Sequence, residues 1–437
     1  MGFFDKLFGG KSSNEPVINF GRYSDAYRTD KQREAFEQSI KEFDKGKYVA
    51  AYHHFFQFLR DEAKDNVKFW EDDKGLRFEL LQGSKKVIGL ADEQRVEVET
   101  KVAVAETLEV GFMKRLMEKN YSLKYGRFAL DDNNGIIMKF NTYVLDGSPY
   151  KLYDALKEVA TNADKLDDLL LDEFKALKSV DTGHIIEISE AEKTVKYDFL
   201  IQAIKDTLTQ IQAMPPTIPS INKGYCLMSL CYKLDYLIRP EGFVMEVLER
   251  INREYFAHDE QTIAAKCRSL QTEFEAILNR PKSEILKEIY QTTSTFGVTM
   301  PVHHDRVRGF IDGEMANMEW YLKHKNYEVA LASASYVVGY CLFNYAVPLP
   351  IREYFHLFYK ITESNYFLNL GYSFDLYQDE IRAFNKSGIK HDINAITKGY
   401  KKQYPNMKPE LDLLNYTNMG TFTQSYLEMI SRLTVDD

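Results

Sequence analysis

Residues 67–104, VKFWEDDKGLRFELLQGSKKVIGLADEQRVEVETKVAV, decide the fold of the first half of this chain. Apolar and polar residues alternate along much of this stretch, which is the period of a half-buried β-strand. Residues typical of turns interrupt the alternation at 72–75, 82–84 and 91–93. The stretch therefore predicts short antiparallel strands in a sheet with one face exposed to water.

Helical periodicity flanks the predicted sheet on both sides. Residues 29–63 carry apolar side chains at helical spacing around a turn sequence, DKGKY, at 44–48, so a helix pair is expected. Further on, the pattern predicts a helix over 109–119 and two strands over 125–130 and 136–143. The sequence DDNNG at 131–135 is a strong hairpin signal between these strands. A long helix is expected from Pro149 to about residue 177, with Ser148 as its cap.

Two segments within this order carry a family resemblance: residues 112–121, FMKRLMEKNY, and residues 126–131, GRFALD. With the turn, strand and long helix that follow, they resemble the type III secretion chaperone-like fold, in particular its YbjN-like branch. The resemblance covers roughly residues 30–178. It implies a non-enzymatic protein; secretion chaperones pair as dimers and hold extended client segments on apolar surface. No functional residues are carried over from it one by one.

The remainder of the chain is predicted to be helical. We divide the sequence into an N-terminal amphipathic segment and linker (1–28), an α+β chaperone-like domain (29–178), a linker (179–194) and an all-α helical domain (195–437). The fold class is thus α+β: a small antiparallel sheet flanked by helices, followed by a helical domain. Antiparallel helical hairpins in a bundle or irregular solenoid are expected for the second half.

Composition narrows the function classes. The 437 residues carry a net charge of −9 and contain no long run of Lys or Arg, so a nucleic-acid partner is not expected. The four cysteines form no CxxC pair and are expected to be reduced, buried thiols. No signal peptide and no apolar run long enough to span a membrane are visible. We therefore expect a cytoplasmic protein.

Aromatic residues concentrate between residues 336 and 377, with many tyrosines among them. Tyrosine is favoured where one end of the side chain stays wet, so a groove for a partner chain is one interpretation. Packing between large helices is the other. The candidate partner-binding residues in this region are Tyr340, Phe343, Tyr354, Phe358, Tyr359 and Tyr366.

The first residues, MGFFDKLFGG, place Phe3, Phe4, Leu7 and Phe8 on one face of a short helix that Gly9 ends. One interpretation is an anchor for a partner groove or a membrane surface, so that any membrane contact would involve only residues 1–8. The alternative is a helix that docks on its own protein, or a frayed end.

Candidate chemistry is sparse. The cluster His303-His304-Asp305 lacks the spacing of a metal site, and Asp305 is expected to cap a helix. The acidic run 164–172, DKLDDLLLD, is expected to lie on the solvated face of its helix rather than to form an acid–base pair. No phosphate loop and no nucleophile elbow occur. The sequence thus predicts no catalytic, cofactor-binding or metal-binding residues.

The resulting hypothesis is a non-catalytic cytoplasmic protein-binding module, a chaperone or adaptor for a protein partner or client, with a homodimer as a further option. The first alternative is an unrecognised hydrolase or metalloenzyme. The second is a structural scaffold anchored by the N-terminal amphipathic segment.

Overall fold

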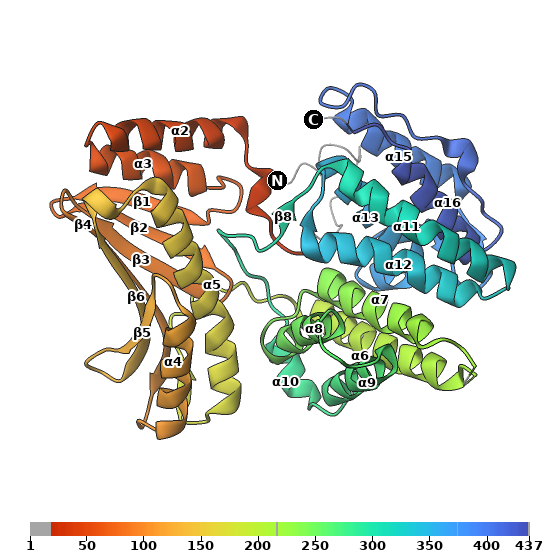
Figure 1. Ribbon diagram of the computed structural model, residues 1–437, viewed down its shortest axis with the longest axis horizontal. Coiled ribbons are helices and arrows are strands. Elements are labelled where there is room, and N and C mark those ends of the chain that lie inside the picture. Colours follow the sequence, from red (N-terminus) through yellow and green to blue (C-terminus); the bar gives the residue numbers. More distant parts are fainter. Residues whose placement is uncertain (1–18, 216, 374, 436–437) are drawn as a thin grey trace.

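An antiparallel sheet forms the centre of the first half, as the alternating sequence predicts (Figure 1). The computed structural model describes residues 19–215, 217–373 and 375–435. The sheet order is β1-β2-β3-β4-β6-β5, and β7 also pairs with β4. The strands are β1 (Val67–Asp72), β2 (Gly75–Gln82), β3 (Lys85–Ala91), β4 (Arg95–Ala105), β5 (Arg127–Leu130), β6 (Gly135–Tyr143) and β7 (Leu177–Ser179).

The register of the sheet places one set of alternating side chains in the core. Val98 of β4 lies opposite Phe140 of β6, and both are buried, whereas their neighbours Glu97 and Asn141 pair on the exposed face. A one-residue slip would reverse the two faces, so the apolar pattern fixes the register. The hairpin at 131–135 forms as predicted: Asn134 adopts a positive φ of 60°, and the Asp131 carboxylate accepts from the Gly135 N–H at 2.6 Å.

Helices cover the buried face of the sheet. The hairpin of α2 (Asp30–Asp44) and α3 (Tyr48–Leu59) packs there, and the rings of Phe56 and Phe78 stack with centroids 4.2 Å apart. The long helix α5 (Pro149–Glu173) crosses the same face and begins as predicted, with the Ser148 hydroxyl accepting from the Lys151 N–H. The remaining elements are α4 (Val110–Ser122) and the 3-10 turns η1 (Asp25–Tyr27) and η2 (Val144–Asp146).

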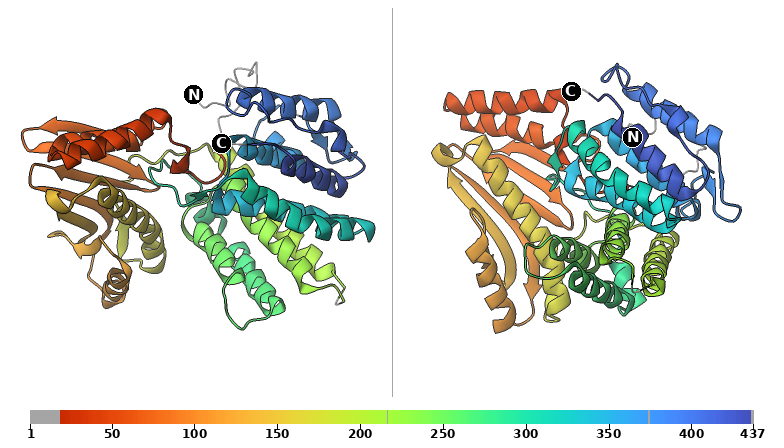
Figure 2. Two further views of the ribbon diagram at one scale, coloured as in Figure 1. Left: turned by 45° about the horizontal axis from the view of Figure 1, so that its top comes forward. Right: turned by 45° about the vertical axis from the view of Figure 1, so that its right-hand side comes forward.

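The second half is built from helices around a separate apolar core (Figures 1 and 2). Its helices are α6 (Glu190–Ala213), α7 (Ser220–Ile238), α8 (Gly242–Tyr255), α9 (Ile263–Leu278), α10 (Lys282–Lys287), α11 (His304–Lys323), α12 (Tyr327–Asn344), α13 (Leu349–Thr362), α14 (Ser364–Asn369), α15 (Lys386–Tyr400) and α16 (Met419–Ser431). Its short elements are β8 (Met300–Pro301), β9 (Tyr345–Ala346), β10 (Tyr377–Gln378), β11 (Ala383–Phe384) and the turn η3 (Leu411–Leu413). Within the described ranges, no helix is both long and apolar enough to cross a lipid bilayer.

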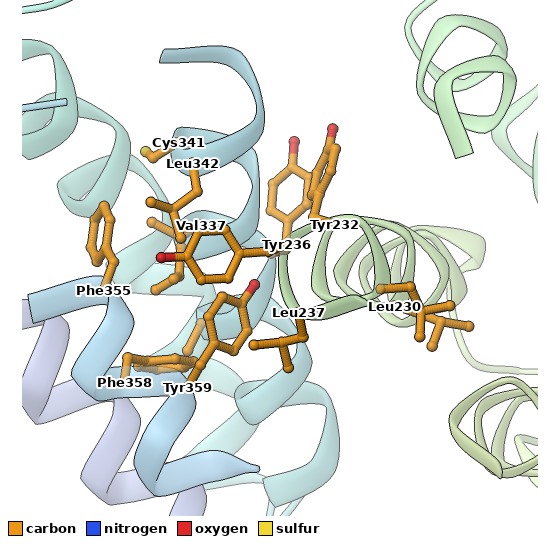
Figure 3. Packing of buried hydrophobic residues seen from close by; sticks show 14 of the residues in the cluster. Leu230, Tyr232, Tyr236, Leu237, Val337, Cys341, Leu342, Phe355, Phe358 and Tyr359 are labelled. Carbon is orange, nitrogen blue, oxygen red and sulfur yellow. The ribbon is translucent and has the colours of Figure 1, made fainter. Parts of the chain in front are cut away.

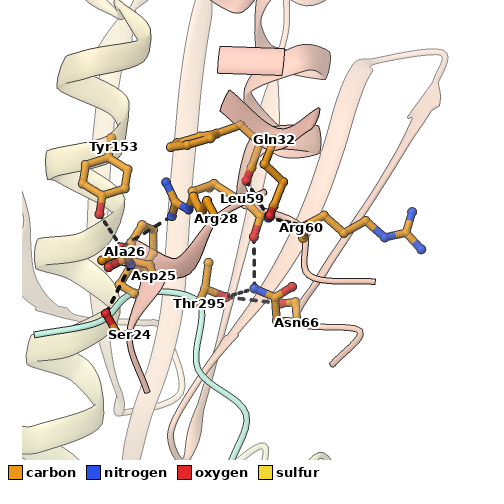
Figure 4. A network of polar contacts seen from close by, with 12 residues as sticks. Ser24, Asp25, Ala26, Arg28, Gln32, Leu59, Arg60, Asn66, Tyr153 and Thr295 are labelled. Atoms are coloured by element: carbon orange, nitrogen blue, oxygen red, sulfur yellow. Dashed lines mark hydrogen bonds and ion pairs between the residues drawn. The ribbon is translucent and has the colours of Figure 1, made fainter. Parts of the chain in front are cut away.

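A segment of the helical half completes the first half. Thr293 bridges to Gly83, and the Gln82 side-chain oxygen accepts from the backbone N–H groups of Thr295 and Phe296 at 3.2 and 2.9 Å. The Phe296 side chain is buried in the core of the sheet half. The Thr295 hydroxyl donates to Leu81 O, and Figure 4 shows its contact with Asn66.

Residues 19–28 also lie between the two halves (Figures 1 and 2). The Gly21 N–H donates to Tyr236 O of α7 at 2.8 Å, and the Tyr153 hydroxyl of α5 donates to the Asp25 carboxylate (Figure 4). Gly21 has a φ of 72°, and a Cβ at this position would overlap the Tyr236 ring. This part of the predicted linker is therefore an ordered strap that touches both halves.

Candidate functional site

Four of the six aromatic candidates of the helical half are core residues. Tyr354, Phe358, Tyr359 and Tyr366 are buried, and Figure 3 shows Phe358 and Tyr359 packed beside Tyr236. The Tyr354 hydroxyl lies 2.8 Å from Thr397 Oγ1, and the Tyr366 hydroxyl donates to a backbone oxygen of α7 at 2.9 Å. Packing between helices, one of the two interpretations that the sequence left open, describes these four residues.

Tyr340 and Phe343 are half-buried on α12. The Tyr340 ring lies 4.7 Å from the ring of Phe310, centroid to centroid, and the Arg22 guanidinium lies 3.8 Å from the centroid of Phe343. The strap thus covers Phe343. The other four candidates, Phe3, Phe4, Leu7 and Phe8, lie outside the described residues.

Three acids of the run on α5 are shielded from water, Asp167 being buried and Asp164 and Asp168 half-buried, so the prediction of a solvated stripe is wrong for these residues. Asp167 pairs with Lys85 at 2.6 Å, with both side chains buried, and accepts from the Ser84 hydroxyl at 2.8 Å. Asp164 accepts from the Ser84 N–H at 2.7 Å, and Asp168 accepts from the Gly242 N–H of α8 at 3.1 Å. Burial raises the pKa of all three carboxyls, and the neighbouring acids add to the shift for Asp164 and Asp168. The reason is that Asp164 and Asp167 face the turn between β2 and β3 at Ser84, whereas Asp168 faces the first residue of α8.

Other candidate groups prove structural. All four cysteines are buried free thiols, and burial raises the pKa of Cys226 to about 12 and of Cys267 to about 11. His303, rather than Asp305, is the N-cap of α11, and Asp305 lies in the first turn. Among the residues that the structure describes, no group of three His, Cys, Asp or Glu side chains is placed to hold a metal ion.

One exposed apolar stripe lies on α4, at the lower end of the first half in Figure 1. Phe112 and Leu116 turn inward and are buried. Val110, Met117 and Tyr121 are 86, 72 and 95% exposed, and their spacing of seven and four residues puts them on one face of the helix. We call these three residues the α4 stripe. The helical period predicts Phe112, Leu116 and Met117 as inward residues; the prediction is confirmed for Phe112 and Leu116 and is wrong for Met117, which belongs to this outer row.

A cavity of about 780 Å³ lies where the two halves meet. The strap of residues 19–28 forms one wall, and the loop after α3 lies beside it. Helices α7, α13 and α15 of the helical half supply the other walls. No sequence pattern predicted this cavity, because its walls come from segments hundreds of residues apart.

No family model matches the chain, and no curated protein matches it significantly. The assignment of a function therefore depends on the surface and the cavity of this chain itself.

Proposed function

We propose that this protein is a non-catalytic protein-binding module, an adaptor or chaperone, and that the α4 stripe contacts its partner. The observation that supports this proposal is the exposure of Val110, Met117 and Tyr121 in one row of a helix whose other face is packed. A partner that covers such a row removes apolar surface from water, which stabilises the complex by roughly 25 cal/mol for each Å² buried. The resemblance to secretion chaperones, which hold clients on apolar surface, points the same way.

Charge beside the stripe indicates the kind of partner. Lys114, Arg115 and Lys119 carry three positive charges on α4 against the single carboxylate of Glu118, in a chain whose net charge is −9. Glu118 lies 3.9 Å from both Lys114 and Arg115, at the limit of an ion pair, and all three side chains are exposed. An apolar row with a basic border fits a partner segment that presents apolar side chains next to acidic ones. We further propose a cytoplasmic location, consistent with four buried free thiols.

A photo-crosslinking experiment tests the α4 stripe. A photoreactive phenylalanine analogue replaces Tyr121 in one variant and Met300 in another, because Met300 is 71% exposed in the helical half. We expect position 121 to crosslink a defined protein in cells that express the chain, and position 300 to give no such product. Adding Met117→Glu should abolish the product, because a carboxylate would face the partner's acidic border.

The matched control for Met117→Glu is Met300→Glu, which changes a methionine of nearly equal exposure. Sedimentation velocity of the purified chain shows whether the partner is a second copy. The proposal fails if position 121 gives no specific product, or if the product survives Met117→Glu as well as it survives Met300→Glu.

A further inference from the structure

The cavity between the halves has the size and the walls of a ligand site. Its volume of about 780 Å³ lies within the range of small-molecule sites, roughly 300–1,000 Å³. Aromatic side chains from both halves form part of the wall. They are Phe20, Tyr23, Tyr27, Tyr236, Tyr345 and Tyr400.

Positive charge dominates this cavity although the whole chain is acidic. Six cationic side chains and three carboxylates line it. Two of the cations are held by acids: Arg22 bonds both oxygens of Asp235, at 2.9 and 2.7 Å, and Arg28 pairs with Asp25 at 3.4 Å. These two pairs fix the strap in place.

Three further cations of the wall, Lys64, Arg239 and Arg352, are less closely paired with carboxylates than Arg22 is. Within the described part of the chain, neither Lys64 nor Arg239 forms an ion pair with a carboxylate. The Lys64 residue is exposed as a whole, and its ammonium lies 4.4 Å from the centroid of the Tyr23 ring. Desolvation of the ammonium and the positive charges of Arg239 and Arg352 lower its pKa to about 8, although Asp61 opposes the shift. Burial also lowers the pKa of Arg239. Among the described residues, the acidic partner of Arg352 is its sequence neighbour Glu353, at 3.4 Å.

Two buried side chains on the wall each have one oxygen atom without a hydrogen-bond partner among the described residues. Glu353 and Thr299 are 3 and 8% exposed, and both line the cavity. Glu353 Oε2 and Thr299 Oγ1 have no partner among the described residues. A buried polar atom without a partner costs about 1–3 kcal/mol, so a polar ligand group that reaches either atom from the cavity would bind favourably.

We propose that this cavity binds a small phosphate ester that also carries hydroxyl groups. The cations Lys64, Arg239 and Arg352 would hold the phosphate, since two guanidinium groups and an ammonium match the charge and the oxygens of a dianion. Thr299 would donate its hydroxyl to the ester. Glu353 would accept from an alcohol hydroxyl of the ligand, a group that inorganic phosphate does not carry.

The site is independent of the α4 stripe. Lys64 belongs to the loop after α3 of the first half, whereas Arg239 ends α7 and Arg352 lies on α13 of the helical half. A ligand phosphate held by all three would join the two halves across the strap. Failure of the α4 proposal would leave this inference untouched, because no residue is shared.

Isothermal titration calorimetry of the full chain at low salt tests the inference. The probes are adenosine monophosphate, ribose 5-phosphate, inorganic phosphate and ribose. We expect at least one phosphate ester to bind with a dissociation constant below about 1 mM, more tightly than inorganic phosphate, and ribose not to bind. Arg239→Gln and Lys64→Gln should each weaken ester binding at least about tenfold.

The matched controls are Arg253→Gln and Lys74→Gln, because Arg253 and Lys74 are exposed and lie outside the cavity lining. They should bind the ester as the parent chain does. Because Lys64 is exposed as a whole, its Gln variant will fold even if the Arg239 variant does not. The inference is overturned if neither ester binds, if inorganic phosphate binds as tightly as the esters, or if Lys64→Gln leaves the affinity unchanged.

Discussion

Breaking the buried ion pair between Lys85 and Asp167 is expected to destabilise the sheet half strongly. The two charges lie 2.6 Å apart with both side chains buried, and the Lys85 ammonium also donates to Val102 O at 3.0 Å. Lys85→Met would leave the Asp167 carboxylate with the Ser84 hydroxyl as its side-chain partner, since Asp167 Oδ1 already has none among the described residues. Removing one partner of a buried pair costs about 3–5 kcal/mol, and we expect a loss of that size at pH 8.

The loss should depend on pH in a defined direction. Burial already raises the pKa of Asp167 above its unfolded value although Lys85 opposes the shift, and removal of Lys85 raises that pKa further. A carboxyl whose folded pKa is raised binds more protons in the folded state, so the folded state loses stability as the pH rises toward that pKa. The deficit of Lys85→Met should therefore be smaller at pH 5.5 than at pH 8.

The chain offers a simple assay for this prediction. Its two tryptophans are Trp70 in β1 and Trp320 in α11, one in each half. In a Trp320→Phe background, the fluorescence of Trp70 reports urea unfolding of the sheet half alone. The double variant Lys85→Met, Asp167→Leu should recover most of the loss, since an apolar pair of similar volume carries no desolvation cost. The reasoning would be refuted if Lys85→Met lowered the unfolding free energy by less than about 1 kcal/mol at pH 8. It would also be refuted if the loss in the double variant equalled the sum of the losses in the two single variants.

Two further perturbations test the contact between the halves. Burial and Asp168 raise the pKa of Glu241 to about 8, so ionisation of Glu241 costs the folded state stability as the pH rises. The gain in unfolding free energy from Glu241→Gln should therefore grow from pH 5 to pH 8, by at most about 1.4 kcal/mol per pH unit. Urea unfolding across that range measures this gain, and a gain that is constant with pH would contradict the prediction. Gly21→Ala should destabilise the chain by about 2 kcal/mol or more, because φ is 72° and the new Cβ would overlap the Tyr236 ring; a melting temperature equal to that of the parent would contradict this.

Local features of the fold follow from the sequence because their causes are local. The turn DDNNG forms a hairpin since Asn134 tolerates a positive φ and the Asp131 side chain binds the Gly135 N–H. Ser148 and Pro149 begin α5 since a hydroxyl can cap the first turn and proline needs no N–H there. The alternation of residues 67–104 fixes the strands and the register in the same way.

Features that depend on distant partners did not follow from the sequence. Periodicity shows that the two faces of α5 differ in polarity, but it cannot show that the β2–β3 turn binds Asp164 and that α8 binds Asp168. Phe296 reads as part of a loop in the helical half, yet its side chain completes the core of the sheet half. The same limit applies to the cavity, because Lys64, Arg239 and Arg352 come from three segments that are far apart in the sequence.

The cavity differs from a hinged cleft because two segments tie the halves together. The strap bonds α7 through Gly21 and Arg22 and bonds α5 through Asp25. In addition, Phe296 from the helical half is buried in the core of the sheet half. Opening the halves would break these hydrogen bonds and expose a buried aromatic side chain, which costs several kcal/mol. The walls are therefore already placed before any ligand binds, and a preformed site loses little ordering entropy on binding. Such a site explains how like charges such as Lys64 and Arg239 can be held near one another: the packing of both halves imposes their approach, and a bound phosphate would relieve it.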